Sequence, residues 1–240
     1  MSVGGEMVLV IVPALNEAAT VGGVVRALRA EGRWDVLVID DGSVDGTADA
    51  AAVAGAMIAV HPENIGVGAA IGTGFRMAAE RGYRAVVQVD ADGQHDVESI
   101  SDILAPVLAD EADLVIGSRF AKGYELSRPR AVAMRLLSAV VSRRIGQRIG
   151  DTTSGFRAFG SAAIERFAVE YPSEYLSDTV EALLLAHASG LRIMERPVTM
   201  HQRAGGKAST GPMRSGYHLV RVLLIVLFRP DRAGPRSSRS

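Results

Sequence analysis

Residues 85–94 read Ala-Val-Val-Gln-Val-Asp-Ala-Asp-Gly-Gln, a short apolar run that ends in an acidic turn. The run up to Val89 predicts a buried β-strand, and Asp90 and Asp92 follow where this strand ends. Two carboxylates one residue apart, in a turn loosened by Gly93, can share one hard cation, and Mg²⁺ or Mn²⁺ held in this way keeps positions open for phosphate oxygens. The stretch therefore predicts a metal-assisted nucleotide site at the end of a strand.

Strand and helix patterns alternate on both sides of this stretch. We expect strands at residues 7–12, 36–39, 57–60, 85–89 and 113–116. We expect helices between them at residues 20–30, 46–54, 68–80 and 97–108. This alternation with short loops is typical of an α/β fold with a parallel, doubly wound sheet, which binds ligands beyond the carboxyl ends of its strands.

Polar turns follow three of the expected strands. Residues 13–17 (Pro-Ala-Leu-Asn-Glu) follow the first strand, residues 40–45 (Asp-Asp-Gly-Ser-Val-Asp) the second, and residues 90–94 the fourth. The carboxyl ends of parallel strands meet at one edge of a sheet, so we expect these acidic side chains to converge. The loops at the opposite edge, residues 31–33 and 80–82, have the composition of ordinary solvated loops.

The second half of the chain is basic where it begins. Residues 119–157 contain nine Lys or Arg against two acidic residues. We expect helices at residues 131–149 and 175–189, a strand at 192–198, a Gly-rich basic loop at 203–209 and a last helix at 213–228. The helix at 131–149 either packs on the sheet or lies with its apolar side on an anionic membrane surface, and the last helix has the same two options.

The composition bounds the class of protein. The chain has 240 residues, 48% of them hydrophobic, which suits one compact domain with a sizeable core. The net charge of −1 excludes a general attraction to nucleic acid, and the absence of cysteine excludes disulfides and thiolate metal sites. The first residues lack the pattern of a secretory signal, and no run reaches the ~20 apolar residues that span a bilayer. We therefore expect a cytoplasmic protein.

Seven motifs occur in a fixed order along residues 7–210: Val12-Pro-Ala-Leu-Asn-Glu17, Asp40-Asp-Gly-Ser43, Asn64-Ile-Gly66, Asp90-Ala-Asp-Gly-Gln94, Gly117-Ser-Arg119, Asp151-Thr-Thr-Ser-Gly-Phe-Arg157 and Arg203-Ala-Gly-Gly-Lys207. Together they resemble the family 2 glycosyltransferases, which have the GT-A fold, and within that family the dolichol- and polyprenyl-phosphate sugar synthases. The resemblance implies a GT-A-like (Rossmann-like), mostly parallel sheet flanked by helices, with acceptor-side helices in the C-terminal part. It also implies an inverting transfer of a sugar from a nucleotide diphosphate sugar to a polyprenyl phosphate or lipid-linked glycan, with Mg²⁺ or Mn²⁺ as cofactor.

The resemblance further implies one glycosyltransferase domain over residues 1–230. Its parts are a nucleotide-sugar-binding half at residues 7–118, an acceptor-side half at 119–212 and a C-terminal helix at 213–230, followed by a disordered tail at 231–240. The expected donor is a UDP-, GDP- or dTDP-sugar, and nucleic acid is not an expected partner. A homodimer and peripheral association with the inner face of the cell membrane are left open.

Asp92 and Gln94 are the predicted direct ligands of the metal, which would neutralise charge on the departing diphosphate. Asp90 either joins them or holds the ribose, and His201 is a candidate for a further ligand. The simpler alternative is that Asp90 and Asp92 only shape a turn or cap the helix that follows.

The nucleotide is expected to lie against the first two turns. Asp40 and Asp41 are predicted to accept N–H donors from the edge of a uracil or guanine base, and the alternative is a type I turn with a helix cap. The other predicted contacts around the nucleoside are Pro13, Ala14, Leu15, Glu17, Asp90 and Ala91. Arg203 and Lys207 lie in the Gly-rich loop, which is predicted to close over the diphosphate, and the alternative is a solvated basic loop.

The chemistry of the acceptor decides the remaining residues. Asp178 and Glu181 lie three residues apart on one helix face, and either is a candidate general base if the acceptor is a hydroxyl, with Asp151 as a rival. Alternatively, the pair on the helix only forms a solvated face or pairs with Arg166. A phosphate acceptor is already anionic and needs no base, and it would then be bound by Arg119, Arg128 and Arg130.

Two other classes of protein stay open. A nucleotidyltransferase also uses a carboxylate-bound metal on such a sheet, and its products would be a new nucleotide-sugar and pyrophosphate. A non-catalytic relative would bind the donor without turnover. The glycine-rich residues 66–72 superficially resemble a dinucleotide fingerprint, but their spacing and the Pro-Glu-Asn at 62–64 favour close packing of a helix N-terminus.

Overall fold

The structure is a computed structural model that describes residues 7–119, 128–172 and 178–199. Its strands are β1 (Val8–Ala14), β2 (Asp35–Asp40), β3 (Met57–Val60), β4 (Ala85–Gln88), β5 (Leu114–Ser118), β6 (Arg157–Gly160) and β7 (Ile193–Pro197). Its helices are α1 (Val21–Ala30), α2 (Thr47–Val53), α3 (Val67–Glu80), α4 (Ser99–Leu108), α5 (Arg128–Ile145), α6 (Ser161–Val169) and α7 (Asp178–Ala188). Strand and helix alternate from β1 to β5, as the sequence predicts.

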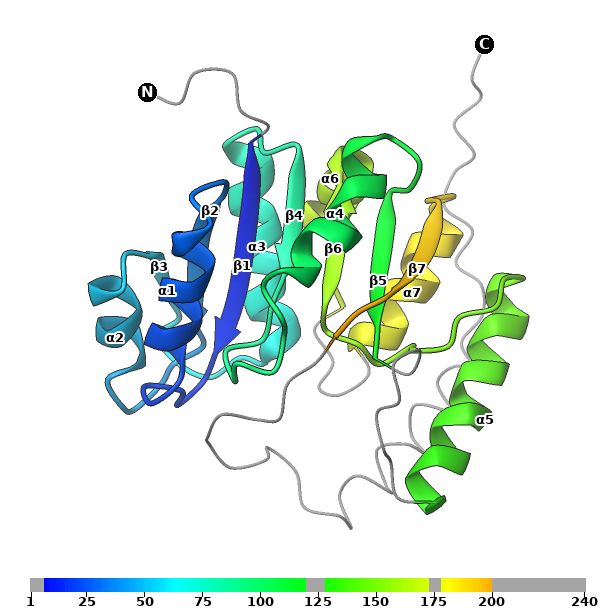
Figure 1. The fold of residues 1–240 in the computed structure, drawn as a ribbon, viewed down its shortest axis with the longest axis horizontal. Coiled ribbons are helices and arrows are strands. Elements are labelled where there is room, and N and C mark those ends of the chain that lie inside the picture. The colour runs from blue at the N-terminus through cyan, green and yellow to red at the C-terminus, as the bar shows by residue number, and fades with distance from the viewer. Residues whose placement is uncertain (1–6, 120–127, 173–177, 200–240) are drawn as a thin grey trace.

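One mixed sheet contains all of these strands, in the order β3-β2-β1-β4-β6-β5-β7 (Figure 1). Neighbouring strands are parallel except at β6, which runs antiparallel to both β4 and β5. The strand order reverses between β1 and β4, because the chain passes from β1 to β2 and β3 on one side and then returns to β4 on the other. Such a reversal leaves a crevice beyond the carboxyl ends of the two strands, where α/β sheets bind ligands.

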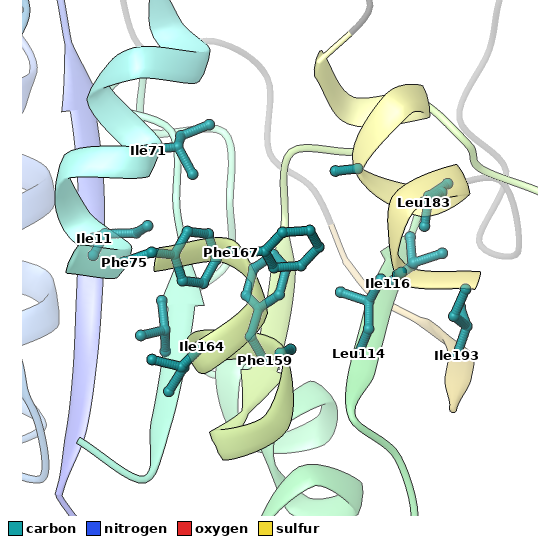
Figure 2. Close-up of a cluster of buried hydrophobic side chains, with 14 of the residues drawn as sticks. Ile11, Ile71, Phe75, Leu114, Ile116, Phe159, Ile164, Phe167, Leu183 and Ile193 are labelled. Atoms are coloured by element: carbon teal, nitrogen blue, oxygen red, sulfur yellow. The ribbon is translucent and has the colours of Figure 1, made fainter. Parts of the chain in front are cut away.

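Helices cover both faces of the sheet, with α1 and α4 in front and α3, α6 and α7 behind in Figure 1. The front face buries side chains such as Leu28 of α1 and Ile103 of α4 against the strands. On the rear face, Figure 2 shows Phe75, Phe159 and Phe167 together, with ring centroids 4.8 to 5.7 Å apart. Strands buried on both faces read as nearly continuous apolar runs, which is why the central strands were visible in the sequence.

Helix α3 contacts the sheet at a glycine, Gly74. A Cβ at Gly74 would lie 2.9 Å from the Cγ2 of Ile11 on β1, so a larger residue would press into the strand. Gly66 precedes the helix with a φ of +102°, a conformation that residues with a Cβ rarely adopt. Residues 66–72 form the N-cap and N-terminal part of α3, where Gly68, Ala70, Ile71 and Gly72 are buried, in agreement with the expected packing of a helix N-terminus.

Two elements of the structure are not expected from the sequence, and the ends of others differ from those expected. Neither β6 nor α6 is predicted, and β6 is difficult to recognise because it has only four residues, one of them the charged Arg157. Because β6 is antiparallel to its neighbours, the sheet is mixed but mostly parallel, which confirms the fold class that the resemblance implies. The helix expected at 131–149 is α5, which ends before Gly146, where φ is +72°. The basic loop at 203–209, the last helix and the tail lie outside the described residues.

Candidate functional site

The exits of β1, β2 and β4 meet at one edge of the sheet, as the sequence predicts. Asp40 lies opposite Ala14 in the register of β1 and β2. On the other side of β1, the Val89 N–H donates to the Ile11 carbonyl over 3.0 Å, and Asp90 is the next residue. The acidic turns therefore lie on either side of the point at which the strand order reverses.

Hydrogen bonds tie the turn after β1 to the turn after β2. The Asn16 N–H donates to the Ser43 Oγ over 2.9 Å, and the Glu17 N–H donates to the Thr47 Oγ1 over 2.8 Å. The predicted nucleoside contacts in this turn differ in exposure: Ala14 is buried, Pro13 and Glu17 are half-buried, and Leu15 is exposed. The two turns are thus linked by hydrogen bonds at the carboxyl ends of β1 and β2.

Asp40 and Asp41 are both buried at the end of β2, each with 3% of its surface exposed. Asp40 Oδ1 accepts the N–H of Ser43 over 2.9 Å. Asp41 Oδ1 lies 2.7 Å from the Nδ1 of His61, and Asp41 Oδ2 accepts the N–H of Gly66 over 2.8 Å. Asp41 therefore connects β2 to the loop that leads into α3, and recognition of a base by either carboxylate stays a prediction.

The turn after β4 presents Asp90, Asp92 and Gln94, all half-buried, while Ala91 is buried. The Gln94 N–H donates to Asp92 Oδ1 over 3.0 Å, and Gly93 takes a φ of +74° at the bend. Carboxylate and amide oxygens are hard donors and suit Mg²⁺ or Mn²⁺.

This turn fits an ion that draws further ligands from elsewhere. In the parts of the chain that the structure describes, no group of three or more His, Cys, Asp or Glu could hold a metal ion by itself. Mg²⁺ is commonly bound by one or two carboxylates together with substrate phosphates, and the donor set of the turn matches that arrangement.

His95 lies directly behind this turn, and the sequence analysis missed it. Its ring stacks on Phe156, with centroids 4.7 Å apart and an interplanar angle of 19°. The Asp90 N–H donates to its Nδ1 over 3.1 Å, and its Nε2 lies 3.6 Å from Asp90 Oδ2. The sequence signal was the position of this histidine, immediately after Gln94.

The loop before β6 reaches the same edge of the sheet. Because β6 is antiparallel, its first residue lies where β4 and β5 have their carboxyl ends. A Cβ at Gly155 would lie 3.0 Å from Asp90 Oδ1 and 3.2 Å from Oδ2, so glycine leaves the room that this carboxylate occupies. The motif at residues 151–157, which precedes β6, therefore lies at the same edge of the sheet as the motifs that follow β1, β2 and β4.

Arg119 and Asp151, for which the sequence predicted different roles, form one ion pair. Arg119 Nε lies 2.8 Å from Asp151 Oδ2, and Arg119 Nη2 lies 3.2 Å from Oδ1. Asp151 is fully buried, and its N–H donates to Glu195 Oε1 over 2.8 Å. A guanidinium therefore engages the Asp151 carboxylate, whose role as a base stays a prediction.

Arg157 is fully buried at the start of β6. Its guanidinium donates to the carbonyls of Ser154 and Thr179 over 2.8 Å each and to that of Thr152 over 3.2 Å. Burial lowers the pKa of Arg157, and nearby acidic groups oppose this shift, in the order Tyr171, Asp178, Asp151 and Asp90. The side chain joins the loop before β6 to the start of α7.

Asp178 and Glu181 lie in the first turn of α7 and are each 5% exposed, so the alternative of a solvated face is wrong. Arg166 pairs instead with Glu170, at 3.0 Å. Burial raises the pKa of Asp178 to about 6, although a backbone N–H and a nearby guanidinium oppose the shift. A carboxyl with a pKa close to neutrality suits a general base, and this role stays a prediction.

Five further residues have predicted roles in binding. His201, Arg203 and Lys207 lie outside the described residues. Arg128 and Arg130 belong to the first turn of α5, after the exit of β5. Their roles in binding metal, diphosphate and acceptor stay predictions.

Comparison with known proteins gives relatives across most of the chain. The model of the family described as Glycosyl transferase family 2 matches residues 9–171. An undecaprenyl-phosphate mannosyltransferase of Micrococcus luteus is 35% identical over 213 residues, which cover 84% of this chain and 86% of that protein. A UDP-N-acetylglucosamine–dolichyl-phosphate N-acetylglucosaminyltransferase of Methanococcus voltae is 29% identical over 213 residues, covering 80% of this chain and 85% of that protein.

Solved structures share the fold. The glucosyl-3-phosphoglycerate synthase of Mycobacterium tuberculosis, in complex with Mn²⁺, UDP and phosphoglyceric acid, matches with a TM-score of 0.71 at 21% identity. The match covers 95% of this chain and 81% of that one. The arrangement of strands and helices is thus one that is already known from a solved structure.

Proposed function

Because the chain belongs to glycosyl transferase family 2 and has a GT-A-like fold, we propose that it transfers a sugar from a nucleotide diphosphate sugar to a polyprenyl phosphate. The observation that carries the proposal is the convergence of the acidic turns after β1, β2 and β4 at the reversal of strand order. The names of two relatives support the acceptor class, since one acts on undecaprenyl phosphate and the other on dolichyl phosphate. Their sugars differ, so the relatives do not fix the donor.

The metal site of the proposal is the turn after β4. Asp92 and Gln94, together with Asp90, would hold Mg²⁺ or Mn²⁺, and the complex of the fold neighbour with Mn²⁺ and UDP supports this choice of ions. When bound, the ion supplies the positive charge that stabilises the departing diphosphate. Asp90, Asp92 and Gln94 would hold this ion at the exit of β4, and the hydrogen bond from the Gln94 N–H to Asp92 Oδ1 helps to fix the shape of the turn.

The nucleoside would lie in the crevice beyond β1. Leu15 is the exposed apolar side chain of the turn that follows this strand, and it offers a surface for the base. Asp40 is fixed by the N–H of Ser43 at the neighbouring strand exit, where its carboxylate can accept N–H donors from the base. Residues 7–118 would thus form the donor-binding half of a single domain.

The acceptor phosphate would attack the anomeric carbon from the face opposite the diphosphate. The new bond joins a phosphate oxygen to this carbon while its bond to the diphosphate oxygen breaks, which inverts the configuration. A phosphate is already anionic near neutral pH, so the attack needs no general base. The Arg119 side chain is 20% exposed, and its ion pair with the buried Asp151 holds it in place. Its guanidinium is therefore a preorganised group at the exit of β5 that can bind this phosphate.

Access to a lipid-linked acceptor would come from peripheral association with a membrane. Within the described ranges, no helix is both long and apolar enough to cross a bilayer. One side of α5 exposes Val132, Arg135, Leu136 and Arg143, a mixture of apolar and basic side chains that suits an anionic interface. Co-sedimentation with anionic vesicles tests this, and equal binding after Leu136→Ser would argue against a contribution of α5.

The test of the function begins with the donor. A thermal-shift screen of UDP-, GDP- and dTDP-sugars, with and without Mn²⁺, should give one large metal-dependent shift. Transfer from that donor to a polyprenyl phosphate should then be lost in Asp92→Ala while the fold is kept. Asp49→Ala, at an exposed position of α2, is the matched control and should remain active. Full activity of Asp92→Ala would refute the metal assignment.

Product analysis separates the other classes of protein. Sugar transfer releases a nucleoside diphosphate, whereas a nucleotidyltransferase releases pyrophosphate and a new nucleotide-sugar. A chain that shows the donor-dependent thermal shift but forms no product with any polyprenyl phosphate would be a binding protein.

A further inference from the structure

We propose that His95 is a positioning residue for Asp90, whose imidazole helps to fix the carboxylate in the orientation from which it would meet the metal. The inference rests on the proposed function, because the metal belongs to that function. It adds a residue from outside the predicted set of ligands. It also assigns a donor-side task to the loop before β6, which the order of motifs had placed in the acceptor half.

Hydrogen-bond geometry fixes the protonation of the ring. The main-chain N–H of Asp90 points at His95 Nδ1 over 3.1 Å, and a backbone N–H can only donate. Nδ1 must therefore be unprotonated, which leaves the single ring proton on Nε2. This second nitrogen lies 3.6 Å from Asp90 Oδ2, just beyond hydrogen-bond length. One ring therefore accepts from the backbone of Asp90 and presents its own N–H to the side chain of the same residue.

His95 and Asp90 differ in the exposure of their side chains, and this difference indicates different roles. The His95 side chain is 3% exposed, whereas the Asp90 side chain is 44% exposed. A ligand at this edge of the sheet can therefore reach the Asp90 side chain, whereas the buried His95 would act only through Asp90. The ring cannot turn easily, because its face is stacked on Phe156.

The backbone at Gly155 lies against the carboxylate as a second confining group, in addition to the imidazole. The position of a Cβ on this glycine would be 3.0 Å from Asp90 Oδ1, which is tighter than ordinary contact. The carboxylate is thus confined between an imidazole from its own turn and a loop that arrives about sixty residues later. Groups that orient a metal ligand in this way change metal affinity by about 10–100-fold when they are removed.

The first experiment measures Mn²⁺ affinity in the presence of UDP by electron paramagnetic resonance. His95→Phe keeps a ring that can stack on Phe156 but removes both nitrogen contacts, and it should weaken Mn²⁺ binding by about 10–100-fold. His187→Phe, at an exposed position of α7, is the control and should leave the affinity unchanged. Equal affinity in His95→Phe and the wild type would overturn the proposal.

The second experiment needs neither metal nor donor and therefore separates this inference from the proposed function. Nitrogen-15 resonances of the histidine rings in the metal-free chain at neutral pH should show one protonated and one unprotonated nitrogen in His95. Asp90→Ala should shift the resonance of the protonated Nε2. Two protonated nitrogens, or no shift in Asp90→Ala, would overturn the proposal even in a chain that binds the metal. If the wild-type chain binds no Mn²⁺, the proposed function fails and these resonances decide the positioning of Asp90.

Discussion

Asp178→Asn is the substitution for which the structure predicts a distinct dependence of stability on pH. The Asp178 carboxyl is 5% exposed, and burial raises its pKa from 3.8 to about 6. Between these two values the folded chain keeps a proton that the unfolded chain has released. The free energy of unfolding therefore falls as pH rises through this range, and ionised Asp178 destabilises the fold above it.

The size of the effect follows from the shift. It amounts to roughly two pH units at ~1.4 kcal/mol each, so ionised Asp178 lowers the free energy of unfolding by about 3 kcal/mol above neutral pH. Asparagine has a similar shape and does not ionise. The variant should therefore gain up to about 3 kcal/mol over the wild type between about pH 4 and pH 7, and the gap should be constant at higher pH.

Urea unfolding over this pH range, in the presence of a chelator, measures the gap. Subtracting the two curves cancels the titrating groups that do not interact with Asp178, and a constant difference between the two side chains does not change the dependence of the gap on pH. Asp102→Asn, at an exposed position of α4, is the control and should give a gap that does not change with pH. A flat gap for Asp178→Asn would refute the argument from burial.

The same variant also tests the class of acceptor. A general base contributes about 10²–10⁴-fold to the rate, so Asp178→Asn should lower kcat by at least that much if a hydroxyl were the acceptor. With a polyprenyl phosphate we expect kcat to be retained, because the attacking oxygen is already ionised. A hundred-fold loss with the phosphate acceptor would contradict the proposed mechanism.

Two further predictions concern packing and buried polar groups. Gly74→Ala should destabilise the fold by about 1–3 kcal/mol because the added Cβ would lie 2.9 Å from Ile11. The control is Gly23→Ala, where a Cβ would have nothing within 4 Å, and it should be neutral or stabilise the fold by up to about 1 kcal/mol. Urea unfolding measures both variants, and an equal loss of stability at the two glycines would show that the contact with Ile11 is not the cause. Arg157→Met should cost about 3 kcal/mol or more, because it leaves two buried carbonyls and one partly buried carbonyl without their donor. Arg26→Met, at an exposed site, should change stability by less than ~0.5 kcal/mol, and a similar small effect at Arg157 would contradict the reasoning.

The donor edge could be predicted from the sequence because it depends on topology alone. The strands leading to Asp40 and Asp90 are apolar and buried, so their ends are visible as a change in composition. Once the strands are taken as parallel, the turns after them must meet. No contact between side chains has to be known for this step, and the structure brings these turns together as expected.

The acceptor side could not be predicted in the same way, because contacts between distant segments decide it. The sequence cannot show that Arg119 and Asp151, 32 positions apart, form an ion pair. Because of this pair, a change at one of the two residues also affects the role predicted for the other. It also cannot show that Asp178 is buried, since the same residue at the start of a helix is more often solvated. Both outcomes depend on where the short strand β6 inserts into the sheet.

Because β6 runs antiparallel to its neighbours, residues from both halves of the chain lie at the same edge of the sheet. Motifs that bind ligands in parallel sheets follow their strands, and a search of strand exits finds them. The loop before β6 reaches the same edge from the opposite direction, because an antiparallel strand begins where its neighbours end. It thereby places Gly155 against Asp90 and Arg157 against the start of α7. A change that displaces this loop should therefore disturb metal binding and the acceptor side together, although the two lie far apart in the sequence.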